Sequence, residues 1–290
     1  MAQEKNKVLG STLYLVGTPI GNLADMSERA KKVLSEVDFI AAEDTRNSMK
    51  LLSLFDIRKE MVSYHEHNKK VSGERIVSRL LAGESCALVT DAGMPAISDP
   101  GEDLVRLCAD AGVIVSVVPG PSAVVSALAL SALSTVRFAF EGFLPAQKNE
   151  RKKRLEAVKY DDRTLVFYEA PHKLKATLAD MADIFGSDRK ISLCRELTKL
   201  NEETMRLTIG DAVMHHDINE PRGEYVLVVA GFEGSVPTDE GEDLTLLSAE
   251  EHVARYESGG MKRMDAIKKA AKDRGLSKSE MYKLLLDESE

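Results

Sequence analysis

Residues 89–101 hold the densest group of atoms in this chain that could bind a ligand. Their sequence is Val-Thr-Asp-Ala-Gly-Met-Pro-Ala-Ile-Ser-Asp-Pro-Gly, and they follow an apolar run at 86–90 that is typical of a buried strand. A turn rich in glycine and proline exposes backbone N–H and C=O groups, and the Asp91 carboxylate can accept hydrogen bonds from a ribose or an amine. The alternative is an ordinary connection to a helix capped by Asp99 or Gly101. The loop alone leaves both interpretations open.

A second glycine-containing loop, residues 17–22, follows the first apolar run of the chain. Its sequence, Gly-Thr-Pro-Ile-Gly-Asn, departs from G-x-G-x-x-G, and it lacks the lysine of a phosphate-binding P-loop. We therefore predict neither a dinucleotide site nor a nucleoside triphosphate site here.

Strands and helices that alternate along the first 118 residues must position these loops. Short apolar runs predict strands at 12–16, 37–42, 61–64, 86–90 and 114–118. Helical patterns occur at 73–82 and 102–111, and another begins at Asp25, with Glu28 completing a capping box, and runs to Leu34. Strands separated by helices predict a largely parallel sheet with both faces covered, and ligands bind beyond the carboxyl ends of such strands.

A second α/β region follows Pro119-Gly120-Pro121. Residues 122–133 predict a helix that is apolar on nearly every side and so buried between layers. Strands are expected at 137–142, 164–169, 190–196, 203–209 and 224–232, the last two as neighbours in a partly antiparallel edge. The predicted domains are residues 1–118 and 119–232, an acidic linker at 233–245, and a helical tail at 246–290. The tail is either a helix-turn-helix or a plain helical hairpin, with a turn at 275–277.

Composition excludes several classes of protein. No apolar run reaches the roughly 18 residues of a membrane span, and the N-terminal residues lack the apolar segment of a signal peptide. Cys86, Cys108 and Cys194 are far apart and odd in number, which predicts reduced thiols and no zinc site. His172 and His215-His216 have no partners at ligand spacing, so no metal is expected. We expect a cytoplasmic globular protein, since 43% of its 290 residues are hydrophobic.

The charge distribution permits targeted contact with RNA. A net charge of −8 argues against indiscriminate nucleic-acid binding. However, residues 147–154 contain five basic side chains and one acidic, and residues 261–285 contain eight basic and three acidic. Charged helix faces are usually just solvated, so these stretches do not by themselves require an RNA partner.

Six segments, in order along the chain, resemble one known family. They are LVGTPIGNL at 15–23, AEDTR at 42–46, TDAGMPAISDPG at 90–101, PGPSA at 119–123, FYEAPHK at 167–173 and RELTK at 195–199. The chain resembles the 16S ribosomal RNA 2′-O-methyltransferases that act on cytidine 1402, within the tetrapyrrole-methylase-like class. The resemblance covers about residues 11–232. The pattern departs from tetrapyrrole-specific members of the class, which favours RNA over a porphyrinoid substrate.

The resemblance implies an α/β fold of two domains of the tetrapyrrole methylase type, with S-adenosylmethionine in the cleft between them and a small C-terminal helical tail. It also implies a homodimer whose substrate is 16S rRNA of the small ribosomal subunit. The cofactor-binding residues that it implies are Asp91, Ala92, Gly93, Ile97, Ser98, Gly120, Pro121, Ser122, Ala123, Phe167, Glu169 and Ala170. Ser122 would serve equally well as a helix N-cap. The substrate-facing residues that it implies are Pro19, Asn22, Lys148, Arg151 and Lys152, of which the last three carry charges that suit an RNA backbone.

Methylation of a ribose hydroxyl requires in-line attack on the methyl group and loss of the hydroxyl proton. Positioning supplies much of the rate, and a base adds to it. Our hypothesis is that Glu43 or Glu66 is the base and that Arg46 holds a phosphate, because both segments follow strands of the first sheet. The alternative for Arg46 is an ion pair with Asp44 that orders the loop.

Two other functions stay open. A tetrapyrrole or other small-molecule methyltransferase could share the fold, because a fold alone does not fix the substrate. A transcriptional regulator would use residues 1–232 as a ligand sensor and the tail on DNA. The tail's last helix offers few base-reading side chains for that role.

Overall fold

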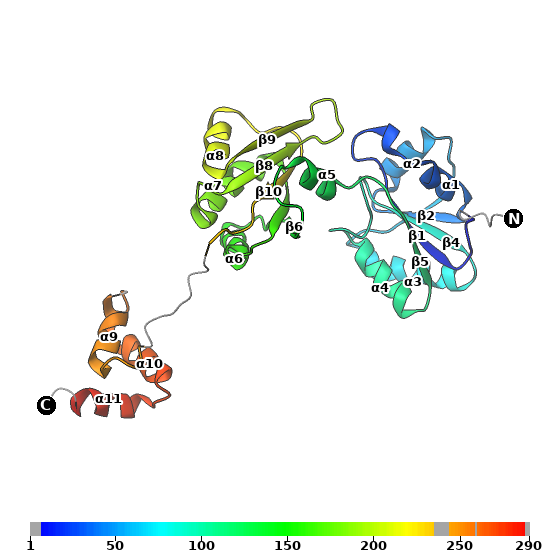
Figure 1. Ribbon diagram of the computed structural model, residues 1–290. Helices are drawn as coiled ribbons and strands as arrows, with labels where there is room; N and C mark the ends of the chain where they lie inside the picture. The colour runs from blue at the N-terminus through cyan, green and yellow to red at the C-terminus, as the bar shows by residue number, and fades with distance from the viewer. Residues whose placement is uncertain (1–6, 235–243, 259, 288–290) are drawn as a thin grey trace. The chain divides into compact units, whose positions relative to one another are not determined.

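The computed structural model describes residues 7–234, 244–258 and 260–287 (Figure 1). The chain divides into two compact units, Met1–Phe232 and Glu233–Glu290. The first unit contains two five-stranded sheets. All strands of the first sheet precede residue 119, and all strands of the second follow it. The predicted acidic linker falls mostly outside the described residues, and the domain boundaries stay predictions.

The first sheet is wholly parallel, with the strand order β3-β2-β4-β1-β5. Its strands are β1 (Thr12–Val16), β2 (Phe39–Ala42), β3 (Glu60–Ser63), β4 (Ser85–Val89) and β5 (Ile114–Val118). Helices α1 (Glu28–Glu36) and α2 (Thr45–Ser53) cover one face, and α3 (Lys69–Leu81) and α4 (Gly101–Asp110) cover the other (Figure 1). The predicted parallel α/β architecture is confirmed, and it brings the loops after β1, β2 and β4 to one edge.

The start of α1 differs from the prediction. Asp25 ends a short 3-10 helix, η1 (Leu23–Asp25), and Met26 and Ser27 then adopt extended conformations. The Ser27 hydroxyl accepts the N–H of Ala30 at 3.1 Å and so caps α1. The prediction of a capping box formed by Asp25 and Glu28 is wrong, because two extended residues separate η1 from α1.

The second sheet has the order β6-β7-β10-β8-β9, in which only β6 and β7 are parallel. Its strands are β6 (Phe138–Phe143), β7 (Thr164–Glu169), β8 (Lys190–Arg195), β9 (Glu203–Thr208) and β10 (Tyr225–Val229). The predicted pairing of the last two strands is wrong. Every residue of β10 is buried, as a central strand requires, whereas β9 is partly exposed and forms the edge.

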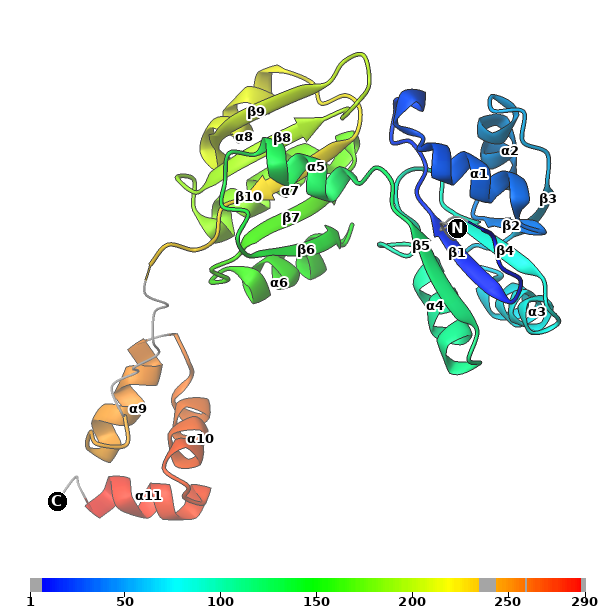
Figure 2. The ribbon, with the colours of Figure 1, turned by 45° about the vertical axis from the view of Figure 1, so that its right-hand side comes forward.

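Helices cover both faces of the second sheet (Figure 2). The helices α6 (Lys148–Val158), α7 (Pro171–Phe185) and α8 (Ile209–Ile218) pack on one face, and α5 (Ala123–Leu130) packs on the other. Helix α5 buries Val124, Ala127 and Leu128, but Val125 is 57% exposed. The sequence predicts a helix buried between layers, whereas only the face that packs on the sheet is buried.

The second unit is a three-helix body with a core of its own. It comprises α9 (Ala249–Ser258), α10 (Arg263–Asp273) and α11 (Lys278–Asp287), whose apolar faces bury Val253, Ile267 and Met281 together. Among the described residues, no helix is long and apolar enough to cross a membrane.

Candidate active site

The loops after β1, β4 and β5 pack against one another at the carboxyl edge of the first sheet. Thr18 and Gly93 form a bridge in which the Thr18 N–H donates to the Gly93 carbonyl at 2.9 Å and the reverse bond measures 3.2 Å. The Thr18 hydroxyl also donates to the Thr90 carbonyl at 3.2 Å. Gly17 and Gly120 approach so closely that a Cβ on Gly17 would lie 2.7 Å from the Gly120 Cα. Only glycine fits at either position.

Asp99 shapes the loop that leads from β4 into α4. Its carboxylate accepts the backbone N–H of Ala96 at 2.9 Å and that of Gly101 at 2.7 Å. Ala96 and Ser98 have φ values of 66° and 63°, which are costly for residues other than glycine. The loop thus serves as the helix connection and also holds Ser98 in a strained conformation.

Tyr64, which follows β3, holds this loop by a hydrogen bond. Its hydroxyl donates to the Pro100 carbonyl at 3.1 Å, and its side chain is only 1% exposed. Burial raises the pKa of Tyr64 to about 12, so the hydroxyl stays protonated and remains a donor.

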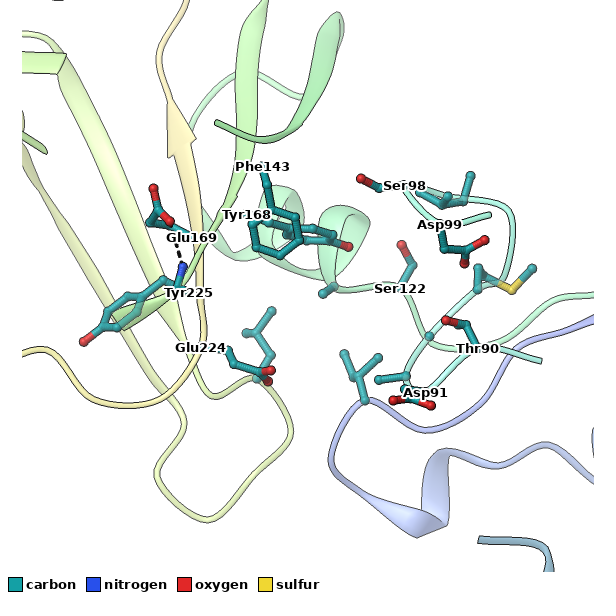
Figure 3. Close-up of a pocket in the computed structure, with 18 of the residues that line it drawn as sticks. Thr90, Asp91, Ser98, Asp99, Ser122, Phe143, Tyr168, Glu169, Glu224 and Tyr225 are labelled. Carbon is teal, nitrogen blue, oxygen red and sulfur yellow. Dashed lines mark hydrogen bonds between the residues drawn. The ribbon is translucent and has the colours of Figure 1, made fainter. Parts of the chain in front are cut away.

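A cavity of about 470 Å³ lies at this edge and takes residues from both sheets (Figure 3). Its volume falls within the range of small-molecule sites. From the first sheet and its loops, it is lined by Ile20, Glu43, Thr90, Asp91, Ala92, Gly93, Met94, Ile97, Ser98, Asp99 and Pro100. From α5 and the second sheet, it is lined by Ser122, Ala123, Phe143, Tyr168, Glu169, Ala170, Cys194, Glu196, Leu197, Lys199, Glu224 and Tyr225.

The wall formed by the first sheet is acidic. Glu43 is exposed at the rim of the cavity, where partial desolvation and the charges of Asp91 and Asp99 raise its pKa above the usual range. Burial also raises the pKa of Asp99. Asp91 accepts a hydrogen bond from the Asn47 side chain at 3.5 Å. This wall can stabilise a positive charge, and Glu43 is more basic than an ordinary glutamate.

The opposite wall combines aromatic rings with one cation. The rings of Phe143 and Tyr168 are tilted against each other, with centroids 5.3 Å apart, and lie close together in Figure 3. The Lys199 Nζ lies 2.9 Å from the Glu196 carboxylate and 2.8 Å from that of Glu224. Of the residues that the structure describes, Lys199 is the only lysine or arginine that lines the cavity.

Comparison with known proteins identifies the family. The family described as Tetrapyrrole (Corrin/Porphyrin) Methylases matches residues 12–213. The chain is 48% identical over 270 residues to "Ribosomal RNA small subunit methyltransferase I" of Bacillus subtilis, covering 93% of this chain and 92% of that relative. The chain belongs to the ribosomal RNA small subunit methyltransferase I family. It is a methyltransferase, and the resemblance inferred from the six segments is confirmed.

A second relative agrees with this assignment, and two solved structures share the fold. The family member from Thermotoga maritima is 46% identical over 221 residues, covering 76% of this chain and 99% of the relative. Uroporphyrin-III-C-methyltransferase from Thermus thermophilus has a TM-score of 0.54 at 19% identity, covering 76% of this chain and 94% of that chain. Diphthine synthase has a TM-score of 0.59 at 14% identity, covering 76% of this chain and 89% of that one. At such low identities, the two structures show the fold alone.

Ten of the residues predicted for this family member lie in the wall of the cavity. Ser122 stands at the N-cap position of α5, yet its side chain makes no capping hydrogen bond and lines the cavity instead. The buried Glu169 carboxylate accepts the Ala170 N–H at 2.9 Å and a bond from Thr177, so it also orders the start of α7. The ten are Glu43, Asp91, Ala92, Gly93, Ile97, Ser98, Ser122, Ala123, Glu169 and Ala170.

Phe167 lies outside the cavity, and its prediction as a contact is wrong. Neighbouring residues of a strand point to opposite faces. Phe167 is fully buried under α6, α7 and α8, whereas Tyr168 points to the face that borders the cavity. Gly120 and Pro121 do not line the cavity either, and the Gly120 N–H donates to the Met94 sulfur at 3.3 Å.

The basic stretch at 147–154 is mostly engaged in ion pairs. Arg151 is 6% exposed and lies 2.7 Å from Asp180, so its predicted contact with RNA is wrong. Lys152 pairs with Asp183 at 2.5 Å, while Lys148 is exposed. Acidic residues of α7, about 30 positions further along the chain, neutralise this surface.

The other predicted residues also lie outside the cavity. Asn22 accepts the Ala24 N–H at 3.0 Å and caps η1, and Pro19 does not line the cavity. Glu66 pairs with Lys69 at 2.8 Å. Arg46 pairs with Asp44 at 3.3 Å, as the alternative interpretation expects, but its side chain remains 82% exposed.

Sequence reasoning missed most of the wall from the second sheet. Strand alternation places Phe167 and Tyr168 on opposite faces of the sheet, but it does not show which of the two faces borders the cavity. Glu196 and Lys199 stand in the RELTK segment, to which no role was assigned. Nothing in the sequence indicated that Glu224 belongs to the site, because its position beside Lys199 depends on the pairing of β10 with β8. Among the described residues, no cluster of three or more His, Cys, Asp or Glu could hold a metal ion.

Proposed function

We propose that this protein transfers the methyl group of S-adenosylmethionine to a ribose 2′-hydroxyl of 16S rRNA, at cytidine 1402 in the small ribosomal subunit. The observation that carries this proposal is 48% identity to a ribosomal RNA small subunit methyltransferase I over more than nine-tenths of both chains. The tetrapyrrole methylases among the solved structures are far less similar, at 16–19% identity.

The cavity fits S-adenosylmethionine chemically. The acidic wall around Asp91 suits a sulfonium and an ammonium group. The faces of Phe143 and Tyr168 suit an adenine ring. When bound, the donor supplies an electrophilic methyl group on a sulfonium that leaves readily.

Glu43 is our candidate for the base. It lines the cavity, whereas Glu66 lies outside it and is paired with Lys69. The raised pKa of Glu43 lets its carboxylate accept the 2′-hydroxyl proton more readily than an ordinary glutamate would. Arg46, exposed three residues away, is our candidate for the phosphate contact.

We infer that the enzyme acts as a cytoplasmic homodimer. Ile114 and Val117 of the edge strand β5 are 59% and 49% exposed, and Val125 of α5 is 57% exposed. Exposed apolar side chains on an edge strand favour association with another chain. Sedimentation equilibrium tests this inference, and a monomer at micromolar concentration would contradict it.

The function is tested by transfer of tritium from labelled S-adenosylmethionine. Small ribosomal subunits, naked 16S rRNA and a porphyrinoid mixture are offered in parallel. We expect label on RNA, and mapping of alkali-resistant linkages should place it at the ribose of cytidine 1402. Label on the porphyrinoid alone would make the protein a small-molecule methyltransferase. Donor binding without transfer to any of the three would favour a ligand sensor.

A further inference from the structure

A shallow, open depression of the surface lies along α2, and none of its lining residues lines the donor cavity. We call it the α2 hollow. Arg46 and Met49 are strongly exposed in it, with 82% of the Arg46 side chain and 50% of Met49 accessible. It is lined by Asp44, Arg46, Asn47, Met49, Lys50 and Ser53.

The α2 hollow offers two cations on one helix face. Arg46 and Lys50 are four residues apart, so they lie on the same side of α2, about 6 Å apart along its axis. Asp44 caps α2 by accepting the N–H groups of Arg46 and Asn47, and it also pairs with the Arg46 guanidinium at 3.3 Å. Within the described parts of the chain, Lys50 makes no ion pair. The hollow therefore retains a positive charge that can meet an anion.

Residues that line the α2 hollow are neighbours of residues that line the donor cavity. Glu43 lines the cavity, and the next residue, Asp44, lines the hollow. The Asn47 side chain, which lines the hollow, donates to Asp91, which lines the cavity, at 3.5 Å. A polymer with one unit at Glu43 can thus place the adjoining unit on α2.

The ligand that matches this surface is single-stranded RNA. Such strands are bound by cations along the phosphates together with side chains, most often aromatic, that pack against the bases. Arg46 and Lys50 supply the cations, and Met49, which also lines the hollow, supplies an adaptable apolar surface. A small inorganic anion would make no use of Met49.

We propose that the α2 hollow binds the nucleotide that adjoins the methylated ribose, with Arg46 and Lys50 on its phosphates and Met49 against its base. This inference rests on the proposed function and extends it by a substrate subsite that includes Lys50 and Met49.

Substitution of Lys50 tests the electrostatic part of the proposal. With the full chain and small subunits as substrate, Lys50→Glu should raise the KM for RNA about ten-fold at 0.1 M salt. It should also flatten the plot of log(kcat/KM) against log salt by about one unit, as loss of one phosphate contact predicts. Met49→Ala should raise the KM about three-fold without changing that slope. The Kd for S-adenosylmethionine should stay unchanged in both variants.

Lys190→Glu is the matched control, since Lys190 is exposed and begins β8, at the opposite end of that strand from Arg195 beside the cavity. If Lys50→Glu and Lys190→Glu change the RNA KM and the salt slope equally, the α2 hollow is no subsite. An unchanged KM in Lys50→Glu would overturn the proposal as well. If the unmodified enzyme labels no RNA at all, the proposed function fails first, which is a separate result.

Discussion

Removal of one hydroxyl at Tyr64 should weaken donor binding although Tyr64 does not line the cavity. The Tyr64→Phe substitution keeps the buried ring and deletes the 3.1 Å hydrogen bond to the Pro100 carbonyl. Loss of one neutral hydrogen bond costs about 1 kcal/mol. The loop that this bond holds contains two residues in a strained backbone conformation, Ala96 and Ser98. Relaxation of the loop would therefore lower its conformational energy.

The free energy lost with this hydrogen bond sets the expected change in the apparent Kd for the donor. If the relaxed loop does not bind the donor, about 1 kcal/mol reduces the binding-competent fraction up to about five-fold, and the apparent Kd rises by the same factor. Isothermal titration calorimetry with S-adenosylmethionine measures this rise. The kcat at saturating donor should change less than the KM, because Tyr64 positions the loop and touches no reacting group.

Tyr14→Phe is the matched control. Tyr14 is 5% exposed and its hydroxyl accepts the Leu9 N–H at 2.9 Å, so a similar hydrogen bond is lost elsewhere in the first unit. Both variants should lower the Tm by about 2–4 °C. An equal fall in Tm with unchanged donor affinity in Tyr64→Phe would refute the reasoning, because the bond would then be purely structural.

Three further outcomes are expected. Glu43→Gln should lower kcat by about a hundred-fold or more. The wild-type activity should fall as the pH drops through the raised pKa of Glu43, because protonation removes the base, and the variant should lack this acidic limb in a plot of kcat against pH. Arg151→Ala should destabilise the first unit by about 3–5 kcal/mol in urea unfolding, since it leaves the buried Asp180 without its main partner, and the RNA KM of the folded variant should stay unchanged. Removal of residues 233–290 should leave the affinity for the donor intact, because the cavity lies wholly in the first unit. The Thermotoga maritima relative is also matched over nearly its whole length by only 76% of this chain. A loss of donor binding would show that the tail completes the site.

Sequence reasoning could predict those residues of the site whose positions depend on the local sequence pattern. An apolar run followed by Gly, Pro and Asp marks the end of a strand, and parallel strands bring such ends to one edge. For this reason Asp91, Gly93 and Ser98 could be placed before any coordinates existed, and the cavity contains all three.

The remainder depended on distant parts of the chain. The charge of Arg151 is neutralised by Asp180, which lies 29 positions away and became its partner only through packing of α6 against α7. The choice of Phe167 over Tyr168 failed because a single strand does not reveal which of its faces borders the ligand. The neighbour of β10 could not be read from sequence, since non-local strand order follows from tertiary packing.

The central place of β10 has a consequence for synthesis of the protein. The first sheet is complete once residue 118 has been made, and it can fold while the rest of the chain is still being translated. The second sheet cannot close in this way, because β10 joins β7 to β8 and is its last strand to be made. Until residue 229 leaves the ribosome, β7 and β8 each present an open edge to other nascent chains. The interval between these two points is the stage of biogenesis at which we expect the chain to depend most on chaperones.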